Sequence, residues 1–327
     1  MKKNILIKKI QENFSVIIPS KKIDNLLIKC IKKIRIFYPN IEIILVLDSI
    51  DKIDNNAKFY KNITIYKSKK KNIAYKRNFA AKKTKKRFLV FIDSDAFPNH
   101  PWLNYYYNEI LINKIVGGPN ISYVKNDEQE MVAKSRLLKV TTLNTNYKKK
   151  SNENIFVNFL PACNLAVEKK LYLKYGGMNE KVFTGEENQF YNKLKNKGIQ
   201  ILLVGKAHVM HQERNIKEFF YQRISYGSSI IDVFIKSPNF MIFTALISSF
   251  NLVFALMILI SAFINLKYLI LIIPFLLISI FITLNIYKNN LLKSFTVSMI
   301  IIFGQSLGFI ISFLGFKNFY KLYRHNK

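Results

Sequence analysis

Two acidic motifs in this 327-residue sequence place carboxylates at spacings that could do chemistry. In the first, Asp93 and Asp95 are separated by one serine and follow the apolar run 88–92. Carboxylate oxygens at this spacing can face one crevice and hold Mg²⁺ or Mn²⁺, and the cation would neutralise a diphosphate. The alternative is an Asx-type turn with solvated acids.

The second motif is the segment GEEN at 185–188, which holds Glu186 and Glu187. Neighbouring positions on a helix point in different directions, so the two acids cannot share one role. A carboxylate in a partly desolvated cleft can have its pKa raised toward neutrality. The alternative is that both acids only begin the next helix, where they favour the positive end of its dipole.

An alternation of strands and helices must position these motifs. Helical spacing of apolar residues over 23–34, and a helix-like stretch over 72–86, separate short β-type runs. These runs cover residues 14–19, 42–47, 63–66 and 88–92. The order predicts a mainly parallel sheet with right-handed crossovers. Ligands of such sheets bind at the carboxyl ends of the strands, where Asp48 and Asp93 fall.

Composition points to a basic protein at a membrane. Half of the residues are hydrophobic and the formal net charge is +31, although Lys, Ile and Asn are enriched together, as in an AT-rich genome. The two cysteines, Cys30 and Cys163, lie far apart without CxxC spacing, which argues against a zinc site or a disulfide framework and fits a reducing cytoplasm. The basic runs 67–72 and 82–87 come with no nucleic-acid motif, so we expect no nucleic-acid partner.

Three uncharged runs follow, over 240–264, 268–287 and 295–316. Each is long enough to cross a hydrocarbon core of about 30 Å as a helix. No charged residue lies within them, which argues against a transporter. The N-terminus lacks the features of a signal peptide, so the residues before the runs are expected in the cytosol.

The predicted domain organisation therefore has three parts. Residues 1–213 form a cytosolic catalytic domain, 214–239 an interfacial amphipathic segment, and 240–327 a transmembrane region of about three spans with a basic tail. With three spans the tail would lie outside the cell, against the positive-inside tendency.

Several short motifs, taken in order, resemble the family-2 glycosyltransferases, which are inverting enzymes that use nucleotide-diphosphate sugars. They are FSVIIP (14–19), EIILVLDS (42–49), YKRN (75–78), DSD (93–95), PWL (101–103), FLPACNLAVEKK (159–170), GGMNEKVFTGEENQF (176–190) and HVMH (208–211). The resemblance implies an α/β fold of the GT-A type, with a mainly parallel, Rossmann-like sheet. Here C-terminal α-helical transmembrane segments would follow it.

The resemblance also implies roles for single residues. The nucleotide-sugar side would be formed by Pro19, Asp48, Lys76, Arg77 and Asp93. The divalent metal would be bound by Asp95, with Asp93 and His211 as further candidates. For His211 the alternative is a structural histidine whose ring nitrogens are satisfied.

Further roles concern the acceptor. Glu187 would be the general base that deprotonates it, and Glu186 would orient it. The acceptor or donor-sugar side would include Trp102, Asn164, Gln222 and Arg223. The last two lie in QRISYG, which loosely resembles an acceptor segment of membrane-bound members. Its alternative is a helix that simply lies on the membrane.

The sequence departs from the family pattern at two places. Leu47, Asp48, Ser49 and Ile50 stand where members commonly have two acids followed by Gly-Ser, so one base-contacting acid is missing. Ser20-Lys21-Lys22 replaces the Thr-Tyr-Asn that often follows the first proline. The identity of the nucleotide therefore stays open.

The predicted protein is a metal-dependent, inverting glycosyltransferase of the inner cell membrane, multi-pass, with its catalytic domain in the cytoplasm. Its partners would be a nucleotide-diphosphate sugar, a lipid-linked or glycan acceptor with a free hydroxyl, and membrane lipid. One alternative is a polyprenyl-phosphate glycosyltransferase, whose anionic acceptor needs little base assistance. Another is a non-catalytic protein that binds anionic lipid.

Overall fold

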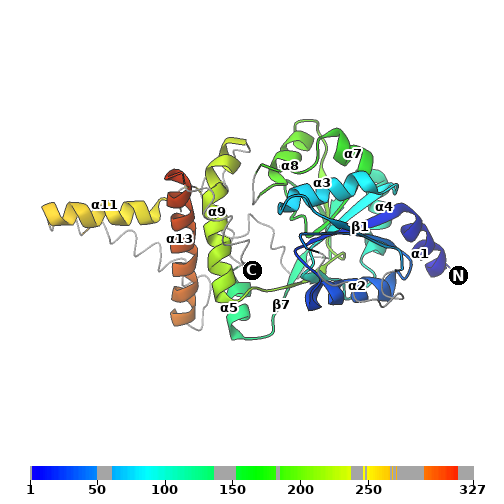
Figure 1. Cartoon of the computed structure of the whole chain (residues 1–327), viewed down its shortest axis with the longest axis horizontal. Helices are drawn as coiled ribbons and strands as arrows, with labels where there is room; N and C mark the ends of the chain where they lie inside the picture. The colour runs from blue at the N-terminus through cyan, green and yellow to red at the C-terminus, as the bar shows by residue number, and fades with distance from the viewer. Residues whose placement is uncertain are drawn as a thin grey trace. The chain divides into compact units, whose positions relative to one another are not determined.

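The computed structural model divides the chain into two compact units, formed by residues 1–123 with 147–212 and by 124–146 with 213–327. The structure describes residues 2–49, 61–135, 152–181, 185–236, 246, 249–265, 267, 270 and 291–315. Ile50, the predicted span 268–287 apart from Ile270, and the basic tail lie outside these residues. Each unit is described by itself (Figure 1).

The first unit is built on an eight-stranded sheet with the order β3-β2-β1-β4-β9-β6-β10-β8. Its strands are β1 (Phe14–Ser20), β2 (Glu42–Leu47), β3 (Ile63–Lys67), β4 (Phe88–Ile92), β6 (Ile115–Gly117), β8 (Asn154–Val157), β9 (Asn164–Glu168) and β10 (Ile201–Val204). The first four are mutually parallel, as the alternation predicted. β9 runs antiparallel between β4 and β6, so the sheet is mixed.

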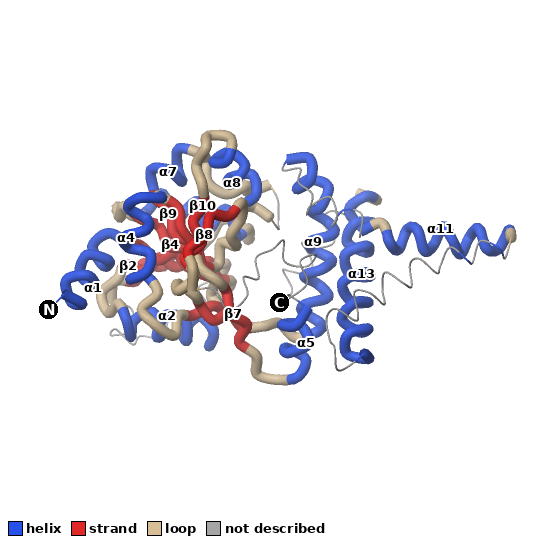
Figure 2. Tube along the Cα trace, turned by 180° about the vertical axis from the view of Figure 1, so that it is seen from behind, coloured by secondary structure: helices blue, strands red, loops and turns tan. Residues whose placement is uncertain are grey.

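Helices cover both faces of this sheet, as Figures 1 and 2 show. One face is packed by α1 (Lys2–Asn13), α2 (Asn25–Phe37) and α4 (Leu103–Asn113), and the other by α3 (Ile73–Lys83), α7 (Lys169–Lys174) and α8 (Asn188–Lys195). Alternate residues of one strand enter opposite cores, as Val16 and Ile17 do. The strands therefore read as unbroken apolar runs, because both faces are buried.

Local capping signals set the starts of the two helices that flank the site. The Asp24 carboxylate accepts a hydrogen bond from Leu27 N at the start of α2, and the Asn72 side chain accepts one from Tyr75 N at the start of α3. Both are N-cap bonds that satisfy an otherwise unpaired backbone donor. The start of α3 fixes which residues of YKRN point into the sheet edge.

A small second sheet was not predicted. It has the order β5-β11-β7, formed by Ala96–Phe97, Val209–Gln212 and Asn120–Tyr123. β11 pairs antiparallel with β5, and His211 is the partner of Ala96. This pairing brings the end of HVMH beside the DSD turn.

The second unit contains α5 (Asp127–Ser135), α9 (Ile216–Lys236), α11 (Asn251–Ile264) and α13 (Leu291–Phe313). Glycines let α9 and α13 approach closely: a Cβ on Gly227 would lie 1.9 Å from the Gln305 carbonyl oxygen, and one on Gly308 would lie 2.0 Å from that of Ile224. Phe219 of α9 is buried in a core with residues of α5 and α13. The apolar stripe expected to lie on a membrane is thus covered in part by the chain itself.

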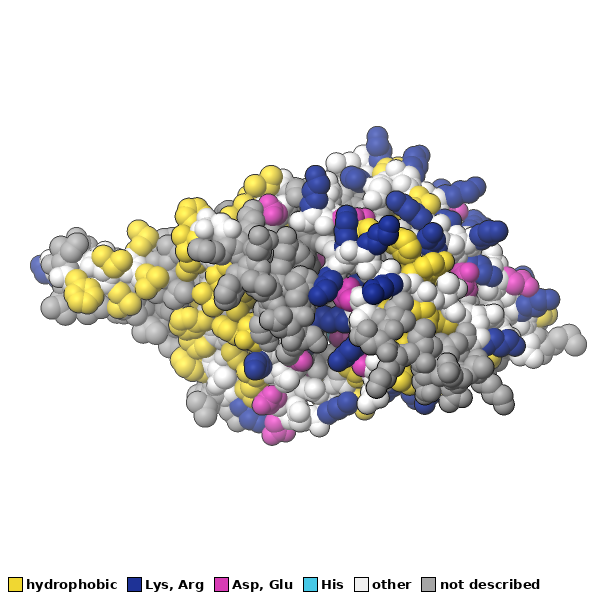
Figure 3. Space-filling view, in the orientation of Figure 1, with side chains coloured by type: hydrophobic (Ala, Val, Ile, Leu, Met, Phe, Trp, Pro, Cys, Tyr) yellow, Lys and Arg dark blue, Asp and Glu magenta, His cyan; other side chains and the backbone are white. Residues whose placement is uncertain are grey.

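Among the described residues one helix, Phe295–Phe313, is long and apolar enough to cross a membrane, and half of it is buried inside the chain. The predicted run 240–264 is described in part, as the 14-residue α11. That helix exposes Leu256, Met257, Leu259, Ile260 and Phe263. Figure 3 shows hydrophobic side chains over this helix, and Lys and Arg side chains over the first unit.

Candidate active site

Three of the residues predicted for the nucleotide side lie at the carboxyl ends of β1 and β2. Pro19 is buried in β1 and is paired with Val46 of β2. Lys76 Nζ lies 2.8 Å from Asp48 Oδ1 and donates a 2.6 Å hydrogen bond to the Ser20 carbonyl oxygen. Lys76 is thus directed inward and ties the ends of the two strands together. The carboxylate of Asp48 stays at the edge, its side chain 14% exposed.

Arg77 links the two acidic motifs. Its NH2 group lies 2.6 Å from Asp93 Oδ1 and its NH1 group 2.8 Å from Glu186 Oε1, and its side chain is 2% exposed. Burial alone would lower the pKa of the guanidinium, but Asp93 and then Glu186 raise it above its usual value. Arg77 therefore stays charged and joins acids that are far apart in the sequence.

Glu186 and Glu187 precede α8, after a turn at Gly185, which has a φ of +71°. Glu187 occupies the N-cap position, yet its side chain makes no capping hydrogen bond. The Glu187 side chain therefore does not cap the helix through a hydrogen bond, whereas the alternative of a favourable interaction with the helix dipole needs no such bond and stays open. Residues 182–184 of the same motif lie outside the described residues.

Glu187 is the acid best suited to accept a proton. The residue is 8% exposed, and its Oε2 has no hydrogen-bond partner among the described residues. Burial first, and then the neighbouring Glu186, raise its pKa to about 8, while Arg77 opposes the shift. A carboxyl group with such a pKa can exchange protons near neutral pH. Glu186, by contrast, is held by Arg77.

Ligand atoms for a cation gather at the DSD turn. One ligand atom each of Asp93, Cys163 and His211 lie within 4.8 Å of one another. His211 Nε2 also lies 3.4 Å from Asp95 Oδ1, and its Nδ1 has no hydrogen-bond partner among the described residues. Carboxylate, imidazole and thiol groups are donors for a divalent metal, so this set fits one. Sequence reasoning missed Cys163, whose only signal was its place beside Asn164.

Two residues predicted for the sugar or acceptor side make internal contacts in the structure. Trp102 is 0% exposed, in an edge-to-face contact with Tyr38 inside the core. The Asn164 amide donates to the Ala207 carbonyl oxygen at 2.8 Å and accepts from the Tyr106 hydroxyl at 2.7 Å. One side chain is buried and the other is hydrogen-bonded internally, and their sugar or acceptor roles stay predictions.

Gln222 and Arg223 belong to α9 of the second unit. The Arg223 guanidinium lies 4.8 Å from the ring centre of Phe219 and 4.7 Å from that of Tyr226. The residue is buried. Its acceptor role stays a prediction.

Asn78, the last residue of YKRN, positions the approach to GEEN. Its Nδ2 donates to the Met178 carbonyl oxygen at 2.9 Å, and its Oδ1 accepts from the Tyr172 hydroxyl at 2.6 Å and from Met178 N at 3.0 Å. Gly177 has a φ of +64°, and a Cβ there would lie 2.4 Å from Asn78 Oδ1. The sequence signal for this role was the glycine pair before Met178.

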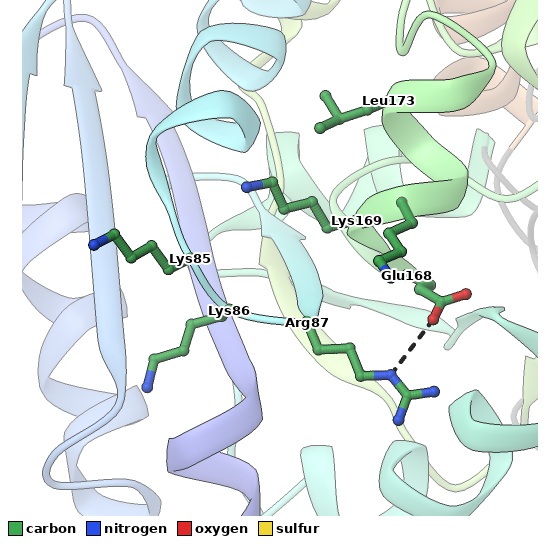
Figure 4. Close-up of a pocket in the computed structure, with 7 residues that line it drawn as sticks. Lys85, Lys86, Arg87, Glu168, Lys169 and Leu173 are labelled. Atoms are coloured by element: carbon green, nitrogen blue, oxygen red, sulfur yellow. Dashed lines mark hydrogen bonds and ion pairs between the residues drawn. The ribbon is translucent and has the colours of Figure 1, made fainter.

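A hollow of about 510 Å³ lies away from these residues (Figure 4). It is lined by Lys85, Lys86, Arg87, Glu168, Lys169, Lys170 and Leu173. Arg87 immediately precedes β4, so the hollow lies at the amino end of that strand, whereas DSD follows the carboxyl end. We assign it no part in the site.

Residues 15–175 match the family model described as glycosyl transferase family 2. No curated protein matches the chain. Among solved structures, the mannosyltransferase PcManGT from Pyrobaculum calidifontis, in complex with GDP-Man and Mn²⁺, is 13% identical, with a TM-score of 0.62 over 96% of this chain and 93% of that one. GalNAc-T7 with UDP, GalNAc and Mn²⁺ is 14% identical, with a TM-score of 0.48 over 67% of this chain. The match spans half of that longer chain.

These comparisons confirm the predicted α/β fold of the GT-A type. Residues 15–175 carry a family-2 glycosyltransferase domain, and the mixed α/β architecture is GT-A-like. At such low identity the likeness to the mannosyltransferase concerns the fold.

Proposed function

We propose, from the family-2 glycosyltransferase domain in residues 15–175, that the chain transfers a sugar from a nucleotide-diphosphate donor to a hydroxyl of a lipid-linked or cell-surface glycan. The observation that carries the proposal is the buried Glu187, with one oxygen unpaired among the described residues and a pKa of about 8. It is joined through Glu186 and Arg77 to Asp93 of the other acidic motif. A base and a diphosphate site are thereby held in one cluster.

The proposed reaction is an in-line displacement with inversion at the anomeric carbon. The nucleotide would lie over the carboxyl ends of β1, β2 and β4, with Asp48 toward the base or ribose. Glu187 would take the proton of the acceptor hydroxyl as that oxygen attacks, and the nucleoside diphosphate would leave from the opposite face of the sugar. Arg77, fixed by both acids, keeps the base side and the donor side at a constant separation.

A divalent cation is part of the proposal. Asp93, Asp95 and His211 would hold it, with donor atoms that already lie close together. When bound, it would offset the charge of the diphosphate leaving group. The mannosyltransferase of similar fold is in complex with GDP-Man and Mn²⁺, and we extend the donor class and the cation to this chain.

We place the enzyme at the inner cell membrane, multi-pass, with the first unit in the cytoplasm. The helix Phe295–Phe313 and the exposed apolar side chains of α11 support attachment, because exposed apolar surface of this kind is costly in water. The high positive charge would add attraction to anionic lipid.

The state of Glu187 favours a hydroxyl acceptor over a polyprenyl phosphate. A phosphate is already anionic and needs little help from a base, whereas a hydroxyl must lose its proton during attack. A buried carboxyl group with a pKa of about 8 is therefore useful as a base for a hydroxyl acceptor, and not for a phosphate acceptor.

Transfer assays with full-length protein in detergent test the function. Radiolabelled UDP-, GDP- and dTDP-sugars would be supplied with Mn²⁺ and a native lipid extract, and products separated with and without mild acid and mild base. We expect one donor to label one lipid-linked or glycan product. If no donor gives a labelled product, the proposed sugar transfer is contradicted. A labelled lipid that carries a monosaccharide phosphate would favour the polyprenyl-phosphate acceptor.

A further inference from the structure

We propose that Cys163 supplies a thiolate to the cation site, so that the site takes a transition-metal ion such as Mn²⁺ or Co²⁺ in preference to Mg²⁺. The inference rests on the proposed function only in placing a cation at this site. It adds a ligand that neither acidic motif contains.

Strand pairing brings the three ligand residues to one point. β4 and β9 are antiparallel, and Ile92 is the partner of Asn164. Asp93 directly follows β4 and Cys163 directly precedes β9, so the two residues lie beside each other just past the end of the ladder. Because this register is part of the central sheet, the thiol has little freedom to move away from the carboxylate.

The third ligand comes from the small sheet. His211 pairs with Ala96, the residue directly after DSD, and the imidazole Nε2 lies 3.4 Å from Asp95 Oδ1. Ligand atoms of Asp93, Cys163 and His211 then lie within 4.8 Å of one another. Bonds of about 2.0–2.3 Å from one ion to such donors are compatible with that separation.

The burial and the donor types of this set decide which cations it prefers. Cys163 is 9% exposed and His211 6% exposed, so two of the donors face a partly desolvated space. Carboxylate and water suit Mg²⁺ and Mn²⁺ alike, whereas thiolate and imidazole suit softer transition-metal ions and are donors that Mg²⁺ takes poorly. An all-oxygen site would discriminate little between Mg²⁺ and Mn²⁺, but a site with sulfur and nitrogen discriminates against Mg²⁺.

Cys30 provides the matched control, because it is the other of the two cysteines. It is 0% exposed in the core under α2, and its Sγ contacts the main-chain oxygen of Asp93 at 3.9 Å. It does not belong to the set of converging ligand atoms. A thiolate signal that survives Cys30→Ala can therefore come only from Cys163.

The experiment titrates full-length protein in detergent with Co²⁺, without a sugar donor, and records the ultraviolet and visible spectrum. Wild type and Cys30→Ala should show thiolate-to-cobalt charge transfer in the near ultraviolet, and Cys163→Ser should lack it. Competition of Mg²⁺ against Mn²⁺ is followed by the spin resonance of free Mn²⁺. Cys163→Ser should bind Mn²⁺ about 10-fold or more weakly than wild type, a loss of affinity that even removal of an outer-shell partner can cause, and its binding of Mg²⁺ should change less.

The outcomes separate this inference from the proposed function. Sugar transfer by a wild type that binds Co²⁺ without the thiolate band, or binds none, would overturn the inference and leave the function intact. A thiolate band in protein that transfers no sugar would support the inference and contradict the function. If Cys163→Ser does not fold, the spectrum of Cys30→Ala still decides, since that variant keeps only Cys163.

Discussion

At the scale of single residues, Glu187 is expected to limit turnover. Glu187→Gln keeps the shape of the side chain but cannot accept a proton, so kcat should fall by roughly 10² to 10⁴. The Kd of the donor should change little, because the diphosphate side is formed by other residues. Steady-state transfer and donor binding measure the two effects.

Glu186→Gln is the matched control for this prediction. It weakens the 2.8 Å contact with Arg77 and leaves the unpaired oxygen of Glu187 in place. We expect a smaller loss of kcat than for Glu187→Gln. A larger loss in Glu186→Gln would move the base to Glu186, and normal turnover in both variants would end the assignment.

The raised pKa of Glu187 also predicts how rate and stability depend on pH. The free carboxylate is the base, so turnover should rise with pH toward a plateau above about 8. In the unfolded chain the same group ionises near its ordinary value, so between that value and about 8 the folded state binds the extra proton. Stability therefore falls as pH rises through this window.

Replacing the Glu187 carboxyl group should restore the folding stability that is lost at high pH. At pH 8 Glu187→Gln should melt at a higher temperature than wild type, by about 2–4 °C for each kcal/mol of relieved desolvation. At pH 4 the difference should vanish, because both states are then protonated. Thermal unfolding at the two pH values measures this, and equal melting temperatures at both would contradict the raised pKa.

Asp95 is expected to matter through the cation. Asp95→Ala removes a carboxylate 3.4 Å from His211 Nε2, so transfer should be lost while the fold is kept. Circular dichroism checks the fold, and wild type in excess chelator is the parallel condition. Full activity of Asp95→Ala, or of wild type in excess chelator, would contradict a role of the metal in the mechanism.

At the scale of elements, the turn at Gly177 should set the path of the chain toward GEEN. Gly177→Ala combines a left-handed φ of +64° with a Cβ only 2.4 Å from Asn78 Oδ1. The left-handed conformation costs about 1–2 kcal/mol, and the clash adds to it. We expect lower stability and lower turnover.

Gly198→Ala is the matched control for the turn. Its φ is +68°, but a Cβ there meets nothing within 4 Å. It should cost only the conformational part, about 1–2 kcal/mol, with normal turnover. Denaturant unfolding and transfer assays compare the two variants, and equal losses in both would show that the contact with Asn78 is unimportant.

At the scale of the whole molecule, three spans would place the first unit and the C-terminus on opposite sides of the membrane. In a cysteine-free background, Lys82→Cys of α3 should be protected in intact cells, and Lys327→Cys should react with an impermeant thiol reagent. The tail carries Lys317, Lys321 and Arg324, so this arrangement opposes the positive-inside tendency. Protection of both cysteines would instead indicate an even number of crossings.

Much of the first unit could be predicted because its signals are local. Apolar runs mark the four parallel strands, apolar spacing marks α2, and the acids follow the strand ends. These patterns depend on the period of a strand or a helix, which a short window of sequence contains. The DSD motif and the acidic pair before α8 could be found in the same way.

Only the tertiary structure decided which side chains meet. Arg77 bridges Asp93 and Glu186 because α3, β4 and the turn before α8 share one edge of the sheet. Cys163 joins the ligands because β9 returns antiparallel to β4. Trp102, which was predicted for the acceptor or donor-sugar side, packs in the core at the start of α4. Such contacts depend on strand order and on pairings between distant segments, and no local period of the sequence records them.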